Sequence, residues 1–384
     1  MQNLFFANSI GDNLATAMTS TSLWTAIAKT IIIIFLGYFM TRKKIFPQGT
    51  GSILTKVVMN VALPCLAFTG FMTDYTMAAG VDAIFNFFFG FVIYIIFMMI
   101  AKVIFLWVKD PTKRLVLSIL FAFGSTTFFA QPLISAVFGK LAYNDSNMLN
   151  VAYRVFLYSY AYIAISGIKL GSTKETSLGA TMKKIFLNPI IIATFVGLLL
   201  WFLQAIPGSA IVRKDWLAPV STVSYEDAAK VAFWRVDVTL PWIYQVATTL
   251  GGLSSPLVWL AIGCTLGNAS IADAAKDKLA WIYSFIKVFG APVIVFVILL
   301  LVEVIAKACN YPQLVSLATV QSSIMMWMVP PATVAVAYCI NFDKEKQMAS
   351  NVSVISTLVA VPGIVFWILI LTVIQSFGYF YVAA

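Results

Sequence analysis

Two apolar segments of this chain are interrupted by proline beside polar residues. The first, 115–138, is interrupted at Pro132, and the second, 314–339, is interrupted at Pro330 and Pro331. Proline removes an amide donor and clashes with the preceding helical turn, so each segment should break and leave backbone groups without helical partners. In a membrane, such breaks persist only against protein or a water-filled cavity. Paired breaks in the two halves of a chain predict a binding site.

Polar side chains near the two breaks are the candidates for that site. Hydroxyl and amide groups can donate to a carboxylate, and the amino ends of broken helices add free amides with partial positive charge. The candidate residues are Asn60, Ser125, Thr126, Gln131, Pro132, Gln321, Ser322, Ser323, Val329, Pro330 and Pro331. A single one of them could merely bond to a neighbouring helix, a common role for Ser and Asn in membranes. Because the group converges on two breaks, we predict that it binds a small organic anion.

Five basic residues lie within or beside apolar segments, where charge is costly. Lys29, Lys56 and Lys102 are close enough to segment ends for their ammonium groups to reach the interface. Arg154 could pair structurally, reach the outer surface, or bind a carboxylate through its planar fork. Lys287 is equally open to a structural and a functional role. Arg154 and Lys287 are therefore the candidates for pairing with an anion.

The predicted spans are almost free of acidic residues, and the chain has no histidine. Of the fifteen Asp and Glu residues, only Glu303 lies inside a predicted span, and the chain has no His. A carrier of protons or cations would be expected to keep Asp or Glu near the breaks. An intramembrane enzyme would need a nucleophile with a base, or a metal cluster. The four cysteines show no metal-binding spacing, so we expect no enzymatic activity, no metal and no cofactor.

The composition places these residues in a membrane. The chain has 61% hydrophobic and 10% charged residues, whereas soluble domains have roughly 25% charged residues. The net charge of +10 is spread over short loops between apolar segments. Because the charge is not gathered on one face, membrane topology explains it better than nucleic-acid binding does. No Lys or Arg precedes the first apolar segment, so we expect no cleavable signal peptide.

Ten apolar runs are long enough to span a bilayer. They are 23–40, 53–71, 84–108, 115–138, 149–168, 188–206, 240–266, 281–304, 314–339 and 352–377. Alternate loops between them hold fourteen Lys and Arg residues on one side and six on the other. Since basic residues concentrate in cytoplasmic loops, both termini should be extracytoplasmic in the cell membrane. Five spans in each half, running in opposite directions, predict an inverted repeat.

This pattern predicts an all-α polytopic membrane protein with four regions. They are an N-terminal extracytoplasmic segment 1–22, a first five-helix repeat 23–168, a cytoplasmic loop 169–187, and a second five-helix repeat 188–384 that includes an extracytoplasmic loop 207–239. Within that last loop, apolar residues recur at helical spacing over 225–238. This spacing predicts an amphipathic helix on the outer interface, with a structural role as a lid or dimer contact.

Five short motifs, in order along nearly the whole chain, resemble signatures of the auxin efflux carrier family. They are 57–64, 123–133, 184–190, 255–263 and 330–332. Bacterial members of that family are commonly malate permeases or carriers of other organic anions. Plant members, which export auxin, have a long cytoplasmic loop after the fifth helix. The corresponding loop here, 169–184, is short, so the chain is more similar to the bacterial carriers.

The resemblance implies a fold like that of the sodium/proton antiporters. Helices 4 and 9 would be interrupted and would cross at mid-membrane, helices 1, 2, 6 and 7 would form a scaffold, and the others would form a mobile transport domain. Secondary transport of an organic anion would proceed by an elevator movement, usually in a homodimer. Family members often place an Asn before the helix 4 proline, where this sequence has Ser125, Thr126 and Thr127.

Other functions remain alternatives at this stage. A sodium-coupled symporter of organic acids is one, because hydroxyl and carbonyl oxygens can bind sodium. A channel and a membrane-embedded ligand sensor are two more.

Overall fold

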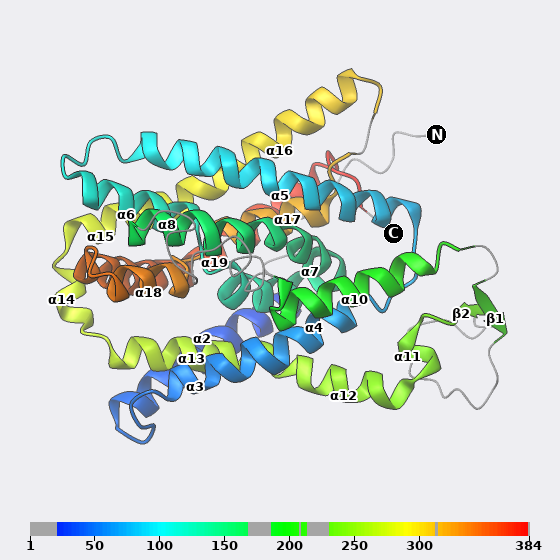
Figure 1. Cartoon of the computed structure of the whole chain (residues 1–384), viewed down its shortest axis with the longest axis horizontal. Helices are drawn as coiled ribbons and strands as arrows, with labels where there is room; N and C mark the ends of the chain where they lie inside the picture. Colours follow the sequence, from blue (N-terminus) through cyan, green and yellow to red (C-terminus); the bar gives the residue numbers. More distant parts are fainter. Residues whose placement is uncertain (1–20, 168–185, 207–208, 213–229, 312–313, 383–384) are drawn as a thin grey trace.

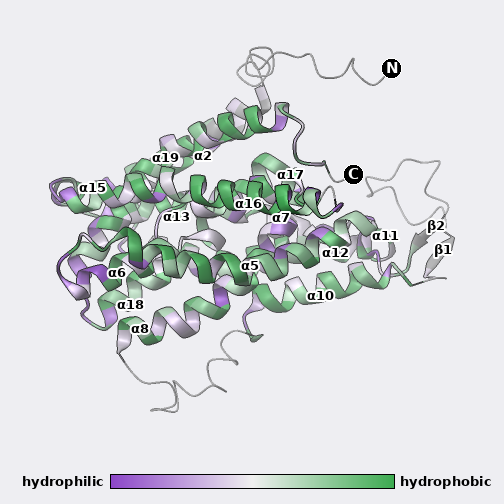
Figure 2. Cartoon of the chain, turned by 90° about the horizontal axis from the view of Figure 1, so that it is seen from above, coloured by the Kyte–Doolittle hydropathy of each residue, from purple (hydrophilic) through white to green (hydrophobic). Residues whose placement is uncertain are grey.

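Helices make up almost all of the structure. The computed structural model describes residues 21–167, 186–206, 209–212, 230–311 and 314–382. Within these ranges, the extended elements are β1 (Ala210–Val212) and β2 (Lys230–Ala232), which pair antiparallel. The elongated bundle carries this hairpin at one end and α14 (Ile271–Ala275) at the other (Figure 1). Its long helices are apolar over most of their length (Figure 2).

The first half of the chain supplies helices in each of the first five predicted spans. They are α2 (Thr21–Arg42), α3 (Thr50–Val57), η1 (Val58–Ala62), α4 (Leu63–Gly70), α5 (Met77–Ile104), α6 (Pro111–Ala122), η2 (Thr126–Ala130), α7 (Gln131–Phe156), η3 (Leu157–Ala161) and α8 (Tyr162–Ser166). The helices α3, η1 and α4 follow one another without a gap, so they form one continuous rod. The predicted fourth span is interrupted between α6 and η2, at 123–125. The expected interruption at Pro132 is wrong, because η2 and α7 run on without a gap there and proline is tolerated in the first turn of α7.

The second half supplies helices in each of the remaining predicted spans. They are α10 (Pro189–Leu203), α11 (Val236–Thr239), α12 (Pro241–Gly252), α13 (Ser254–Asn268), α14, α15 (Lys278–Phe285), η5 (Ile286–Gly290), α16 (Ala291–Ala308), α17 (Leu317–Trp327), α18 (Thr333–Asn341) and α19 (Lys346–Ser376). The predicted ninth span is interrupted between α17 and α18. Both spans that were predicted to break are thus interrupted in the backbone.

Five helical stretches in the described part of the chain are long and apolar enough to cross a membrane. They are Thr50–Gly70, Met77–Ile104, Pro241–Asn268, Lys278–Ala308 and Lys346–Ser376. The chain is therefore a helical membrane protein. The inverted repeat of ten spans and the proposed regional boundaries stay predictions. The predicted cytoplasmic loop falls largely on 168–185, outside the described residues.

The helices pack in two groups. In the first group, α13 packs on α2 and α3, while α10 and α12 pack on α4. In the second group, α7 packs on α5 and α17, while α19 packs on α15 and α18. The first group contains the helices expected to form a scaffold. The second group contains the helices expected to carry the substrate, including both broken ones.

Glycine allows the tight crossing of α2 and α13 in the first group. A Cβ atom added to Gly263 would lie 2.1 Å from the carbonyl oxygen of Ile34, and one added to Gly37 would lie 2.3 Å from that of Leu260. Both distances are far below van der Waals contact, so the two backbones touch directly. Close backbone contact through small residues is the usual way in which membrane helices associate. The first group is thereby held together without polar side chains at this crossing.

Three prolines follow a π-helical turn at the same spacing. The turns η1, η2 and η5 end two residues before Pro64, Pro132 and Pro292, respectively. Proline cannot donate a helical hydrogen bond, and its ring crowds the carbonyl one turn earlier, so the helix widens before it. Such turns are frequent at functional sites. Each of them carries a residue that the sequence singled out, namely Asn60 in η1, Thr126 in η2 and Lys287 in η5.

The predicted loop between the fourth and fifth spans is wrong. Residues 139–148 belong to α7, which changes direction at Gly139, where φ is 81° and ψ is −163°. This backbone conformation is open to glycine and strained for other residues. The polar residues that follow Gly139 made the segment read as a loop, but most of them are buried against other helices. The turn between the two spans is therefore a single sharp kink.

The predicted amphipathic helix over 225–238 is also wrong where it can be checked. Residues 230–232 form β2, and only Val236–Thr239 is helical, as α11. Ile211 lies opposite Val231 in the hairpin. The buried Arg235 pairs with Asp237 at 2.6 Å and with Asp74. The pairing of β2 with β1 replaces the helix that the local pattern predicted. The first part of the predicted helix, 225–229, lies outside the described residues.

Candidate functional site

The two helix breaks meet and pair with each other. The amide of Ser125 donates to the carbonyl oxygen of Pro330 at 2.7 Å, and the amide of Ala332 donates to that of Phe123 at 2.9 Å. Gly124 thus lies opposite Pro331 in an isolated antiparallel bridge. Each break satisfies backbone groups that proline and the loss of helix would leave unpaired. The prediction that the two interrupted segments converge is confirmed.

Helix ends of both signs surround this crossing. The helices α6 and α17 end there, whereas η2 and α18 begin there. A helix amino end carries partial positive charge and free amides, and a carboxyl end carries partial negative charge. Thr333, the first residue of α18, is exposed. The amino end of α18 is therefore the more accessible of the two positive ends.

Lys287 holds the carboxyl end of α6 at the crossing. Its buried ammonium donates to the carbonyl oxygen of Phe121 at 2.8 Å and lies 5.3 Å from the centre of the Phe121 ring. A cation at this position offsets the negative end of the helix dipole. A Cβ atom on Gly124 would lie 3.3 Å from the same ammonium. Lys287 therefore stabilises the break itself, which is the structural role left open by the sequence.

One face of α7 presents four polar side chains to the first break. Tyr143, Asn147, Asn150 and Arg154 follow one another three or four residues apart, so they share one side of the helix. We call these four residues the donor row. Asn150 accepts a hydrogen bond from the Thr126 hydroxyl at 2.6 Å, and Asn147 accepts one from the Gln131 amide at 2.6 Å. The donor row is thereby fixed against the π turn η2 and the first residue of α7.

The donor row has more donors than the described residues can satisfy. The Tyr143 hydroxyl, the Nδ2 atoms of Asn147 and Asn150, and Nη1 of Arg154 are buried without a hydrogen-bond partner there. Gln131 Oε1 and Ser323 Oγ at the breaks also lack one. Each buried polar group left unpaired costs about 1–3 kcal/mol. Several such groups at one place in a folded protein call for a ligand that brings acceptors.

Arg154 dominates the electrostatics of this site. Only 2% of the residue is exposed, so the guanidinium does not reach the outer surface. Its neighbours are the hydroxyls of Tyr94, Tyr143, Tyr153 and Tyr158, and within the described residues it forms no ion pair. The sequence left three roles open for Arg154: a structural ion pair, a position at the outer surface, and binding of a carboxylate. Burial excludes the outer surface, and the described contacts include no structural ion pair. An unpaired buried cation is costly, and its planar fork fits a carboxylate.

A comparison with protein families agrees with this geometry. A family profile described as membrane transport protein, which represents the auxin efflux carriers, matches residues 22–368. The chain belongs to the auxin efflux carrier family. Among curated proteins, no match was found. As a member of this family, the chain is a membrane transport protein, which agrees with the expectation that it is not an enzyme.

In this family member, several other predicted residues bond locally. Asn60 is exposed in η1 and donates to the Lys56 carbonyl of its own helix at 2.8 Å, so no hydrogen bond joins it to the crossing. Ser322 donates to the Thr319 carbonyl one turn earlier at 3.0 Å. Gln321 is half-buried on the same helix. The structure places Ser125, Thr126, Val329, Pro330 and Pro331 at the crossing itself. Gln131 and Pro132 lie at the start of α7, and Ser323 lies one turn before the end of α17.

The start of α7, close to the first break, also touches the other helix group. The hydroxyl of Ser255, in α13, donates to the carbonyl oxygen of Pro132 at 3.0 Å. Gly70, in α4, is likewise joined to α7 because its carbonyl accepts from Asn144 at 2.8 Å. These contacts place the site where the two helix groups meet.

The sequence interpretation missed the first three members of the donor row. Tyr143 and Asn147 fall in the segment predicted as a loop, and Asn150 lies at the start of the predicted fifth span, where only Arg154 was recognised. The signal was present in their spacing, which matches that of Arg154 on a helix. Glu303 is the only acidic residue inside a predicted span, but two more lie just outside the predicted bounds. Asp82 lies in α5 and Asp145 lies in α7, and both are buried.

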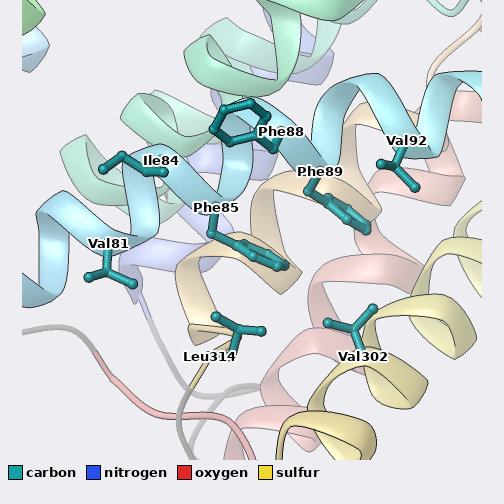
Figure 3. Close-up of a pocket in the computed structure, with 8 residues that line it drawn as sticks. All are labelled: Val81, Ile84, Phe85, Phe88, Phe89, Val92, Val302 and Leu314. Atoms are coloured by element: carbon teal, nitrogen blue, oxygen red, sulfur yellow. The ribbon is translucent and has the colours of Figure 1, made fainter. Parts of the chain in front are cut away.

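A separate cavity of about 470 Å³ lies between α5, α16 and Leu314 (Figure 3). Its lining is entirely apolar and includes Phe85 and Phe88 of α5 and Val302 of α16. Without a polar group, this cavity offers a carboxylate no hydrogen bond. This cavity therefore lacks the polar groups expected of the predicted anion site.

Proposed function

We propose that this protein is a secondary active transporter of small organic anions, such as malate or another carboxylate. The observation that carries the proposal is the buried Arg154 guanidinium, which lies beside a paired helix break without a carboxylate partner among the described residues. Removing such a cation from water costs several kcal/mol unless an anion accompanies it. A substrate carboxylate supplies that charge, and its oxygens supply the missing acceptors.

The donor row defines how the substrate is held. Arg154 Nη1 and the side-chain amides of Asn147 and Asn150 donate to the carboxylate. The exposed amino end of α18, at Thr333, adds positive potential from the second broken helix. Gln131 and Ser323 hydrogen-bond the polar remainder of the substrate. Both helices that bind the anion belong to the second helix group, so the site moves as that group moves.

Alternating access follows from the two helix groups in this proposal. The first group stays fixed in the bilayer as the scaffold, and the second group carries the anion across as an elevator. Two inverted repeats of five spans place both termini outside the cell membrane, in accord with the loop charges. As is usual in the family, the carrier works as a homodimer.

Counterflow in proteoliposomes tests the proposal. Vesicles preloaded with unlabelled malate should accumulate labelled malate in a saturable way. Arg154→Gln should lower the rate at limiting malate about tenfold or more, because losing hydrogen bonds to a charged group costs about 1.5–3 kcal/mol. Arg154→Lys should recover part of the loss, since it keeps the charge without the fork. Arg42→Gln, at an exposed site that bonds Ala269, should transport like the parent protein.

The results of these assays distinguish the proposed function from the alternative functions. Saturable counterflow distinguishes a carrier from a channel and from a ligand sensor. A panel of monocarboxylates, dicarboxylates and indole acids then identifies the preferred anion. Saturable transport of a cationic or uncharged compound, with Arg154→Gln fully active, would show that the site does not bind an anion.

A further inference from the structure

A second polar cluster lies away from the donor row. It also involves α7, which carries the donor row, and α17, which carries Ser323. It is formed by residues from α5, α7, the start of α17 and the end of the chain. We call it the aspartate cluster, and its members are Asp82, Asn86, Asp145, Ser316, Thr319 and Tyr381. All of these residues are buried except Tyr381, which is half-buried. Neither the family assignment nor the proposed anion site accounts for it.

Hydrogen bonds connect the cluster through Thr319. The Thr319 hydroxyl donates to Asp145 at 3.1 Å and accepts from the Asn86 amide at 2.8 Å. Since its single proton goes to Asp145, the Ser316 hydroxyl, 3.0 Å away, must donate to Thr319. The hydroxyl of Tyr381 donates to Asp82. Each of the three hydroxyl protons is thus already in use.

The cluster has acceptors left over. The Asn86 amide nitrogen donates to the backbone carbonyl of Asp82 at 2.9 Å, which fixes the orientation of the amide. Its Oδ1 is fully buried and finds no donor within the described residues. This amide lies beside the Asp145 carboxylate. The two carboxylates lie near enough to each other for their charges to interact.

The carboxyl groups of the cluster also lack a cationic partner among the described residues. Asp82 and Asp145 form no ion pair within the described residues, and Tyr381 and Asn86 bring no positive charge. Lys307, the basic residue near this end of α16, is engaged by Glu303 at 3.5 Å and by the Tyr379 carbonyl at 3.2 Å. Glu303 itself accepts from the amide of Val315, next to the cluster. The cluster therefore suits a cation, whereas the donor row suits an anion.

Carboxylate, hydroxyl and amide oxygens are the ligands of hard cations. Calcium takes six to eight oxygens and often binds carboxylates through both of theirs. Here one oxygen of each carboxylate is already engaged by a hydroxyl, from Thr319 or Tyr381. The free oxygens that remain fall short of the six to eight that calcium takes, which favours a monovalent hard cation. Sodium is such a cation, and cells keep it at an inward gradient across their membrane.

The cluster and the anion site share helices at adjacent positions. Asp145 is two residues before Asn147 on α7, and Thr319 is one turn before Ser323 on α17. A cation that joins Asp145 to Thr319 therefore fixes the same two helices that present donors to the anion. Ordering those helices for one ligand lowers the cost of ordering them for the other. By linkage, each ligand then raises the affinity for the other.

We propose that the aspartate cluster binds sodium and that its occupancy promotes binding of the anion at the donor row. The binding of sodium stands on the cluster alone, whereas the coupling rests on the proposed transport function.

Thermal unfolding of the purified carrier tests the binding directly. Replacing choline chloride by sodium chloride at constant ionic strength should raise Tm, because a ligand of the native state stabilises it by mass action. Asp145→Asn and Asp82→Asn should unfold cooperatively in choline and lose the sodium-dependent rise. Thr319→Ala, which keeps both carboxylates, should reduce it. Asp273→Asn, at an exposed carboxylate in α14, is the matched control and should keep the full rise.

If a variant fails to fold, sodium binding can still be tested on the parent protein alone. Labelled sodium should bind in a scintillation assay and be displaced by unlabelled sodium but not by potassium. Proton release or uptake without sodium binding, or displacement by calcium at far lower concentration, would overturn the choice of ion. A Tm that ignores sodium in the parent protein, or an Asp273→Asn variant as impaired as Asp145→Asn, would overturn the site.

The coupling is measured separately in proteoliposomes. An inward sodium gradient should raise the initial rate of malate uptake several-fold, and Asp145→Asn should abolish that increase. Sodium binding with malate uptake indifferent to sodium would overturn the coupling and leave the ion site intact. Sodium binding without transport of any organic anion would instead refute the proposed function.

Discussion

Nη2 of Arg154 and the hydroxyl oxygen of Thr127 lie 3.5 Å apart beside the first helix break. A hydrogen bond at this distance is weak, so the guanidinium keeps most of its donor capacity for another partner. The contact orients Arg154 towards the break without neutralising it. This arrangement suits a residue that must accept an anion and release it again.

Replacing Gln131 or Ser323 by Ala should weaken substrate binding by about 1 kcal/mol or more each, roughly a fivefold rise in Kd. Both side chains are fully buried and keep an unpaired oxygen beside the crossing. Calorimetric titration with malate measures the change. Thr357→Ala, whose hydroxyl bonds Ser353 within α19, is the control. Unchanged affinity in both variants would place the site elsewhere.

Lys287→Met should destabilise the protein without changing its affinity for the anion. The substitution removes the donor that satisfies the Phe121 carbonyl, and a buried unpaired carbonyl costs about 1–3 kcal/mol. We expect a lower Tm with an unchanged Kd for malate. A large rise in Kd with normal stability would assign Lys287 to the substrate instead.

Gly124→Ala should disturb the pairing of the two breaks. Its new Cβ would lie 2.8 Å from Val329 Cγ2, and such overpacking costs about 1–3 kcal/mol. Gly252→Ala is the matched control, because nothing lies within 4 Å of its added Cβ. Thermal unfolding should show a lower Tm for the first variant and no decrease for the second. Equal Tm values for both variants would show that the crossing adapts to the extra atom.

Single-cysteine labelling should confirm the membrane orientation. In a background without the four native cysteines, Ser209→Cys should react with an impermeant thiol reagent added outside intact cells. Lys276→Cys, at the opposite end beside α14 (Figure 1), should react only after permeabilisation. The loop charges require this result. The reverse labelling pattern would invert the topology.

The second helix break was predictable because proline cannot make the helical hydrogen bond. The first break lies at 123–125, before Pro132, so its position was not predicted by the proline. Their mutual pairing was consistent with the resemblance to a family, but its hydrogen bonds join residues from opposite halves of the chain. No local pattern specifies which carbonyl Ser125 will bond. The coarse site at the crossing was therefore predictable from the sequence, whereas its backbone geometry was not.

Parts of the donor row and of the aspartate cluster were missed because of their local polarity. Asn147 and Asp145 follow a glycine in a polar stretch, and such stretches usually form loops. Here tertiary partners bury them: Gln131 bonds Asn147, and Thr319 bonds Asp145. Hydrogen bonds made across the fold thus stabilise a helix that local polarity disfavours.

The hydrogen bond from Ser125 to Pro330 also constrains how the protein is made. The first break enters the membrane during synthesis long before the ninth span leaves the ribosome. In the interval, its exposed backbone groups have no partner in hydrocarbon, where each costs several kcal/mol. The nascent first half must therefore keep this break hydrated or covered by the insertion machinery, and only arrival of the second break allows it to be released into lipid.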